Sequence, residues 1–213
     1  MRRWFFWLVL FLVGCEKPPP VAPAVTPTVS LPAVLAFGDS LTAGYGVSPD
    51  QAWPAVLERK LQANGYRWRV VNAGVSGDTS RDGLNRLDWV MRVKPRVVML
   101  ELGANDGLRG LDPKLTQANL VRLVQRIKAH QAQVLLLGMQ MVTNMGSSYT
   151  TAFKAIYPTV AEQEHVSLMP FLLQGLGTDD LRQADGLHPT QAGHQRIAED
   201  VYPYLIPLLA PGS

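Results

Sequence analysis

Ser40, Asp185 and His188 are the residues whose types and spacing point most directly to catalysis. A serine hydroxyl is a weak nucleophile until a base takes its proton and a third group orients that base. Asp185 and His188 lie three residues apart with a glycine between them, so a single turn can direct the carboxylate at the imidazole. With Ser40 they form a possible Ser-His-Asp set in the chain order Ser, Asp, His, which is suited to acyl transfer.

Acyl transfer also needs hydrogen-bond donors placed where negative charge develops on the carbonyl oxygen. Three candidates follow three different expected strands: the Ser40 N–H, the Gly77 N–H and the Asn105 side-chain amide.

Ser76 is a rival nucleophile, because it also lies in a turn bracketed by glycines. Serines and glycines follow the strands of any α/β protein, so spacing alone leaves a purely structural interpretation open. The G-x-S-x-G elbow of the larger α/β-hydrolase fold is absent.

Alternating apolar runs and helical patterns must position these residues. Strands are expected at 33–37, 68–71, 96–100, 134–137 and 166–169. Helices are expected near 51–64 and 79–91, from Asp112-Pro113 through Ile127, near 149–164, and in a last segment through Leu208 that Pro203 and Pro207 bend. This alternation predicts a parallel sheet with helices on both faces. Ligands of such sheets bind beyond the carboxyl ends of the strands, which is where the candidate residues stand.

Four of these post-strand segments together resemble the GDSL, or SGNH, hydrolase family. The letters GDSL stand at 38–41, and the four signature residues of the family match Ser40, Gly77, Asn105 and His188. The resemblance covers nearly all of residues 34–209. It is strongest to the branch that contains the bacterial thioesterase I, arylesterase and lysophospholipase L1 enzymes.

The resemblance implies a three-layer α/β/α sandwich of flavodoxin-like kind, with a five-stranded parallel sheet. It selects Ser40 over Ser76 as nucleophile and gives the other triad roles to Asp185 and His188. It also implies oxyanion donors at the Ser40 and Gly77 amides and the Asn105 side chain. The expected reaction is acyl transfer to the serine and hydrolysis of the acyl-enzyme, with no metal and no cofactor. Asp39 is expected to hold the nucleophile turn in shape or to cap a helix.

One segment departs from the family pattern. Members of this branch often carry a proline-containing, Asn-Tyr-Gly-like loop after the fourth strand, which helps to shape the acyl pocket. Residues 138–146 lack the proline and have Met145 in place of the aromatic residue. Flexible methionines suit an acyl chain, although Met139 and Met141 can equally be core residues. The candidate substrate-binding residues are Met141, Asn144, Met145 and Leu187.

The first fifteen residues predict export and a lipid anchor. Arg2 and Arg3 precede an apolar run at 4–13, which is too short to cross a membrane but suits the core of a signal peptide. The run ends Leu-Val-Gly-Cys, which resembles the lipobox of bacterial lipoproteins. This resemblance implies cleavage after residue 14 and acylation of Cys15. An ordinary signal peptide or a buried N-terminal helix is the alternative.

Residues 15–32 are expected to form a proline-rich, partly extended tether between this anchor and a hydrolase domain at 33–213. Glu16 is not the aspartate that retains many Gram-negative lipoproteins at the inner membrane. In such a host we therefore expect the outer membrane, facing the periplasm.

The composition limits the remaining classes of function. A single cysteine excludes a disulfide framework and a cysteine-based zinc site. His194 follows His188 by six residues rather than four, so no helical metal site is expected, and His130 and His165 are expected to be structural or solvated. Without residues 1–14 the chain has 18 Lys and Arg against 17 Asp and Glu, which gives no support to a nucleic-acid partner. Nothing indicates an assembly larger than a monomer.

Three functions therefore remain in competition. The leading one is a membrane-tethered serine esterase that acts on acyl esters, thioesters or lysophospholipids. The second is a carbohydrate or cell-wall O-acetyl esterase. The third is a catalytically silent surface lipoprotein that binds a glycan or a protein partner.

Overall fold

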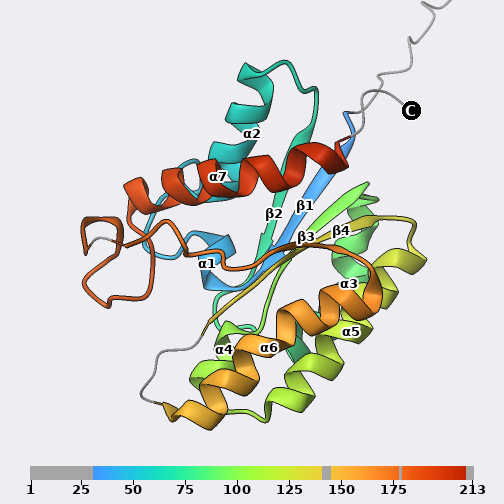
Figure 1. Ribbon diagram of the computed structural model, residues 1–213. Helices are drawn as coiled ribbons and strands as arrows, with labels where there is room; N and C mark the ends of the chain where they lie inside the picture. The colour runs from blue at the N-terminus through green and yellow to red at the C-terminus, as the bar shows by residue number, and fades with distance from the viewer. Residues whose placement is uncertain (1–30, 141–144, 178, 210–213) are drawn as a thin grey trace, which may run out of the picture. The chain divides into compact units, whose positions relative to one another are not determined.

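The structure, a computed structural model, describes residues 31–140, 145–177 and 179–209 (Figure 1). The predicted signal peptide, Cys15 and most of the tether lie outside the described residues. So do Met141 and Asn144, two of the candidate substrate-binding residues.

Five parallel strands form the sheet, in the order β2-β1-β3-β4-β5. They span Ala33–Gly38 (β1), Arg69–Gly74 (β2), Val97–Glu101 (β3), Gln133–Leu137 (β4) and Ser167–Met169 (β5). This is the flavodoxin-like order, which confirms the predicted five-stranded parallel sheet. Every residue of β1 and β3 is buried, as expected for central strands that are covered on both faces.

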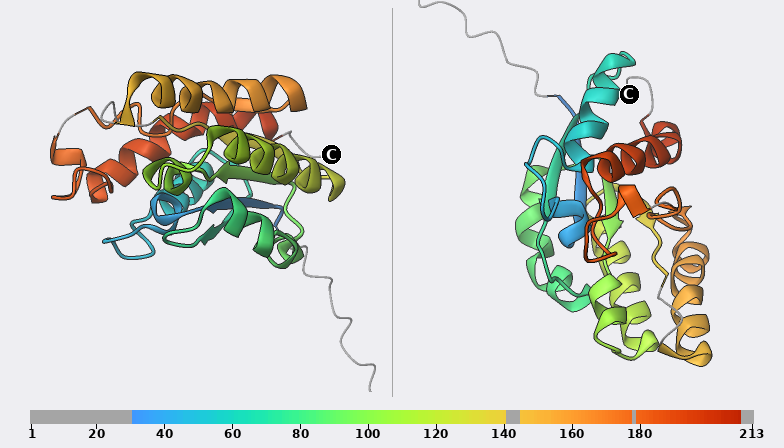
Figure 2. Two further views of the ribbon diagram at one scale, coloured as in Figure 1. Left: turned by 90° about the horizontal axis from the view of Figure 1, so that it is seen from below. Right: turned by 90° about the vertical axis from the view of Figure 1, so that its left-hand side faces the viewer.

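Two groups of helices cover the sheet, one on each face (Figures 1 and 2). On one face α2 (Trp53–Ala63) packs against α7 (Gln191–Leu205). On the other face α5 (Pro113–Ala129) lies between α3 (Ser80–Val90) and α6 (Ser147–Glu164). The expected three-layer sandwich is therefore confirmed.

Local sequence signals explain where several helices begin. Thr79 and Asp82 form a reciprocal capping box at the start of α3, so that each side chain accepts from the backbone N–H of the other. Asp112 caps α5 through the Lys114 N–H, and Pro113 occupies the first helical position. Both helix starts lie where the sequence predicted them.

The last helix ends earlier than predicted. We expected it to continue through Leu208, but α7 ends at Leu205 and Ile206–Leu208 form a 3-10 turn, η4. Pro207 has no N–H with which to continue the helical hydrogen bonds, and its ring crowds the preceding turn. Two short helices, α1 (Ser40–Ala43) and α4 (Ala104–Leu108), lie where the sequence indicated only loops. No helix of the described residues is both long enough and apolar enough to span a membrane.

His194 is a fully buried imidazole between α7 and α2. Its Nδ1 accepts the Trp53 N–H at 3.3 Å, and its Nε2 has no partner among the described residues. Burial, with a smaller contribution from the charge of His188, lowers the pKa of His194 from 6.5 to about 4.

This shift predicts that His194 destabilises the folded chain in acid. Between pH 6.5 and pH 4 this histidine binds a proton in the unfolded chain but not in the folded chain, so the free energy of unfolding falls as the pH falls. The expected loss from this residue is about 2 kcal/mol between pH 7 and pH 5. It is measured as the difference in urea-unfolding free energy between the wild type and His194→Gln at each pH.

The comparison with His194→Gln is necessary because Asp39 acts in the opposite direction. Burial raises the pKa of Asp39 from 3.8 to about 6, so this carboxyl adds stability as the pH falls through the same range. Both proteins contain Asp39, so its contribution cancels in the difference. A stability difference that does not change between pH 7 and pH 5 would contradict the prediction.

Candidate active site

Ser40 stands at the first position of α1, directly beyond the carboxyl end of β1. Asp39 caps this helix, because its Oδ1 accepts the Leu41 N–H at 3.0 Å. Gly38 must be a glycine, since a Cβ there would stand 2.6 Å from the Glu101 carbonyl oxygen and collide with the side chains of Thr42 and Glu101. The tight turn that presents Ser40 therefore depends on close packing of β1 against β3.

The structure brings Ser40, His188 and Asp185 together in one line of contacts. His188 Nε2 lies 2.9 Å from Ser40 Oγ, and His188 Nδ1 lies 2.6 Å from Asp185 Oδ2. Asp185 Oδ1 accepts the N–H groups of Leu187 and His188, both at 2.9 Å. The hydrogen bond from the His188 ring, followed by these backbone bonds, lowers the pKa of Asp185 to about 2. An ionised carboxylate at this position can orient the imidazole and stabilise its charged form.

Two neighbouring residues that the sequence did not single out hold the histidine loop in place. The ring of Tyr45 lies against that of His188, with centroids 4.5 Å apart. The Gln183 side-chain amide donates to the carbonyl oxygens of both Tyr45 and Pro189, at 2.8 Å each. Gln183 thus joins the segment that follows α1 to the segment that carries Asp185 and His188.

Asn105 lies in the first turn of α4, and its side-chain amide contacts both the nucleophile turn and the segment that follows β2. Its Nδ2 donates to Asp39 Oδ2 at 3.1 Å and to the Asp78 carbonyl oxygen at 3.0 Å. The Ser40 and Gly77 N–H groups have no hydrogen-bond acceptor among the described residues. Gly77 has a φ of +87°, a left-handed conformation that favours glycine.

These groups surround a cavity of about 350 Å³ at the carboxyl edge of the sheet. Tyr45, Leu108 and Leu187 give it an apolar wall beside Ser40 and His188.

Ser76, the rival nucleophile, also lines this cavity but forms no hydrogen bond with His188. Of the proposed substrate-binding residues, Leu187 lies in the lining. Met145 does not; it lies beside Gly110, whose Cβ position would be 3.6 Å from its Cε.

Two buried carboxyl groups lie beneath the nucleophile turn. Glu101 Oε2 accepts the Asp39 N–H at 3.2 Å and the Thr42 hydroxyl at 2.8 Å. Burial, and then the charge of Asp39, raise the pKa of Glu101 well above its ordinary value. Asp39 in turn accepts from the Leu41 N–H and from the Asn105 amide. The contacts of Asp39 agree with both expectations, because its side chain caps α1 and its backbone and side chain hold the nucleophile turn.

Arg86 of α3 connects the two loops that bear the candidate backbone oxyanion donors. Its guanidinium donates to Asp78 Oδ2 at 2.6 Å, to the Ala73 carbonyl oxygen at 2.8 Å and to the Gly38 carbonyl oxygen at 2.9 Å. The ring of Phe37 lies below the guanidinium, with its centroid 4.4 Å away. The planar fork of arginine allows these bonds to form at once, which a lysine cannot reproduce.

We therefore expect Arg86→Lys to reduce kcat on a soluble ester by about 10²-fold, because a shift of about 1 Å in catalytic groups has effects of that size. KM should change by less than about twofold, since Arg86 does not line the cavity. The matched control is Arg81→Lys, an exposed arginine of the same helix, which should leave both constants unchanged. This role would be contradicted if Arg86→Lys had an unchanged kcat, or if only its KM differed from that of the wild type.

No three His, Cys, Asp or Glu side chains come together as possible metal ligands within the described ranges. His130 and His165 are both exposed and lie far along the chain from the triad segments, at the ends of α5 and α6.

Comparison with known proteins identifies similar chains over most of this length. Residues 36–196 match the model of the GDSL-like Lipase/Acylhydrolase family. Esterase TesA of Pseudomonas aeruginosa is 45% identical over 187 residues, which are 87% of this chain and 93% of that protein. Thioesterase 1/protease 1/lysophospholipase L1 of Escherichia coli is 42% identical over 178 residues, which are 83% of this chain and 84% of that protein. A crystal structure of TesA superimposes with a TM-score of 0.79 at 46% identity, over 83% of this chain and 99% of the other.

Proposed function

Because this chain belongs to the GDSL-like lipase/acylhydrolase family and is a carboxylic ester hydrolase, we propose that it works through an acyl-enzyme on Ser40. The observation that carries this proposal is the line of contacts from Ser40 Oγ to His188 Nε2, at 2.9 Å, and from His188 Nδ1 to Asp185. Each distance is short enough for the proton transfer that activates a serine.

In the first half of the reaction Ser40 Oγ attacks the acyl carbon while His188 Nε2 takes the hydroxyl proton. The carbonyl oxygen becomes an oxyanion that the Ser40 and Gly77 N–H groups and the Asn105 amide stabilise. When the intermediate collapses, His188 gives its proton to the leaving oxygen or sulfur. In the second half water attacks the acyl-enzyme with His188 again as base, which releases the acid and restores Ser40.

The proposed substrates are aryl esters, acyl thioesters and lysophospholipids. The Escherichia coli relative carries both a thioesterase and a lysophospholipase name, and it covers 83% of this chain. The apolar wall formed by Tyr45, Leu108 and Leu187 suits an acyl chain better than a sugar ring, because it offers few polar groups for hydroxyls to bind.

The test is hydrolysis of a p-nitrophenyl ester series, from acetyl to dodecanoyl, by the residue 31–213 domain. A maximum at medium or long chains supports the proposed substrates. Activity limited to the acetyl ester, with release of acetate from acetylated glycans, would instead favour an O-acetyl esterase. A folded protein that neither hydrolyses any ester nor reacts with a fluorophosphonate probe would show a non-catalytic lipoprotein.

We also propose that the chain is exported and held through acylated Cys15, at the outer membrane facing the periplasm of a Gram-negative host. The support is the cationic start, the short apolar run and the single cysteine at the lipobox position. Labelling with a radioactive fatty acid tests this: wild type should take up label and Cys15→Ser should not. Label retained by the variant would contradict acylation at Cys15.

A further inference from the structure

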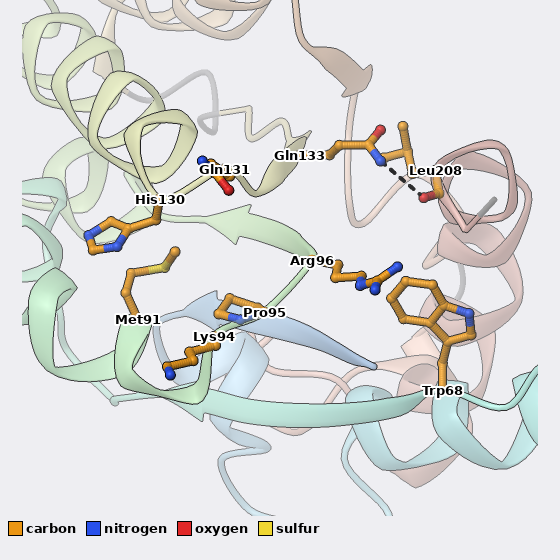
Figure 3. Close-up of a pocket in the computed structure, with 9 residues that line it drawn as sticks. All are labelled: Trp68, Met91, Lys94, Pro95, Arg96, His130, Gln131, Gln133 and Leu208. Carbon is orange, nitrogen blue, oxygen red and sulfur yellow. Dashed lines mark hydrogen bonds between the residues drawn. The ribbon is translucent and has the colours of Figure 1, made fainter. Parts of the chain in front are cut away.

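The amino ends of the five parallel strands form the edge of the sheet opposite the candidate active site. A hollow of about 610 Å³ opens at this edge, around the segments that lead into β3 and β4 (Figure 3). Trp68 and Leu208 lie at one end of it and Met91 and His130 at the other. A second hollow of about 330 Å³ continues from it, because the two share Gln131, Gln133 and Leu208.

Positive charges outnumber negative charges at this edge. We call it the basic edge and define it by six residues on the segments that enter β2, β3 and β4: Arg67, Arg69, Arg92, Lys94, Arg96 and Lys128. Residues 31–213 contain 17 Lys and Arg and 16 Asp and Glu, so the domain as a whole is nearly neutral. The acidic residues in the matching last turns of α3 and α6 are Asp88, which pairs with Arg126, the exposed Glu162, and Glu164, which is buried and accepts from the side chains of Gln125 and Gln163.

The ends of the helices do not cancel this charge. The helices α3, α5 and α6 all end at this edge, and each carboxyl terminus carries about half a negative charge. Lys128 already donates to one of these ends, the Glu164 carbonyl oxygen, at 2.8 Å. The full positive charges of the arginine and lysine side chains at this edge still exceed these partial charges.

The chain also enters the domain at this edge. The Arg69 N–H donates to the Pro32 carbonyl oxygen at 3.1 Å, and the Arg96 N–H donates to the Ala33 carbonyl oxygen at 2.9 Å. Pro32 and Ala33, near the start of the described chain, therefore lie beside Arg69 and Arg96 at this edge. The residues between Cys15 and the first described residue are few enough to span at most about 50 Å when fully extended, so a lipid anchor on Cys15 would hold this edge within that distance of the membrane.

We propose that the basic edge docks on the anionic phospholipid headgroups of the membrane to which the chain is tethered. The choice of this partner rests on the proposed acylation of Cys15, which places a charged lipid surface within reach of this edge. Each Lys or Arg next to an anionic bilayer contributes to binding, and attachment through the tether raises the effective concentration of the surface. In this orientation the cavity beside Ser40 faces away from the supporting bilayer, so its substrates arrive from the aqueous side.

The residue 31–213 domain is a suitable test protein, because Leu31–Ser213 form a compact unit of their own. We would measure its flotation with vesicles of phosphatidylglycerol and phosphatidylcholine, and with vesicles of phosphatidylcholine alone. The wild type should bind the anionic vesicles, and binding should weaken as salt is raised. It should not bind the neutral vesicles.

The decisive variant is Arg92→Glu with Lys94→Glu, two exposed residues of the basic edge without a hydrogen-bonded side chain among the described residues. Affinity for the anionic vesicles should fall by at least about 25-fold, on the basis of about fivefold for each cation. The matched control is Arg122→Glu with Lys154→Glu, which makes the same change of charge on exposed positions of α5 and α6. The control should bind nearly as well as the wild type.

Equal binding by the decisive variant and the wild type would overturn the proposal, as would equal losses in both double variants. The proposal would also be overturned if the wild type bound neutral and anionic vesicles equally well, or if it bound a single-stranded oligonucleotide more tightly than the anionic vesicles. Hydrolysis of a soluble ester separates this inference from the proposed function, because neither double variant touches the triad. A domain that binds vesicles without hydrolysing esters contradicts the esterase mechanism alone, and an active esterase that does not bind them contradicts the docking alone.

Discussion

Ser40→Ala should reduce kcat for p-nitrophenyl esters by about 10⁴- to 10⁶-fold, the range seen when members of a catalytic triad are removed. The reason is chemical, since the variant has no hydroxyl within reach of His188 Nε2 and no atom that can carry the acyl group. KM for the residual reaction should stay within a few-fold of the wild type, because the cavity walls are unchanged. The fluorophosphonate probe, which labels activated serines, should no longer label the protein.

Ser76→Ala is the matched control, because Ser76 lies in the same cavity without a hydrogen bond to His188. It should retain labelling by the probe and a kcat close to that of the wild type. The proposal of an acyl-enzyme on Ser40 is wrong if Ser40→Ala keeps most of the wild-type activity, or if the fluorophosphonate probe labels Ser40→Ala but not Ser76→Ala.

Asn105→Ala should reduce kcat by about 10²- to 10³-fold, the usual effect of removing one oxyanion donor. Asn105 lines the cavity beside Ser40, and its amide donates to Asp39 Oδ2 and to the Asp78 carbonyl oxygen, so one of these two bonds must be given up to bind an oxyanion in the cavity. An oxyanion that forms there can attract the same amide more strongly than the neutral carbonyl of the bound substrate does. The loss should therefore fall on kcat, with KM changed by less than about twofold.

Asn119→Ala separates this effect from a general loss of polar contacts. Asn119 is also a partly buried amide, and its Nδ2 donates to Ser80 Oγ at 3.0 Å, in the network around Asp106. This control should lose some stability and little kcat. Equal losses of kcat in the two variants, or a loss in Asn105→Ala that thermal unfolding explains, would count against the oxyanion role.

The sequence determined the parts of this protein that depend on near neighbours in the chain. The apolar runs and the capping signals at Thr79 and Asp112 placed most strands and helices within a few residues, because strand burial and helix capping are local properties. The order of the elements then led to the parallel sheet. The motifs around Ser40 and His188 indicated which strand ends carry the chemistry, since a parallel sheet gathers those ends at one edge.

Only the tertiary structure decided which side chains support that chemistry. Arg86 reaches Gly38 across 48 positions of the chain, and Gln183 reaches Tyr45 across 138. Neither residue belongs to a local pattern, because each acts through contacts with carbonyl groups that folding brings near. The same holds for the basic edge, which a nearly neutral composition hides. The charged residues of the basic edge are scattered along the sequence and come together only because the parallel strands align their amino ends. The composition therefore could not reveal the basic edge, whereas the fold does.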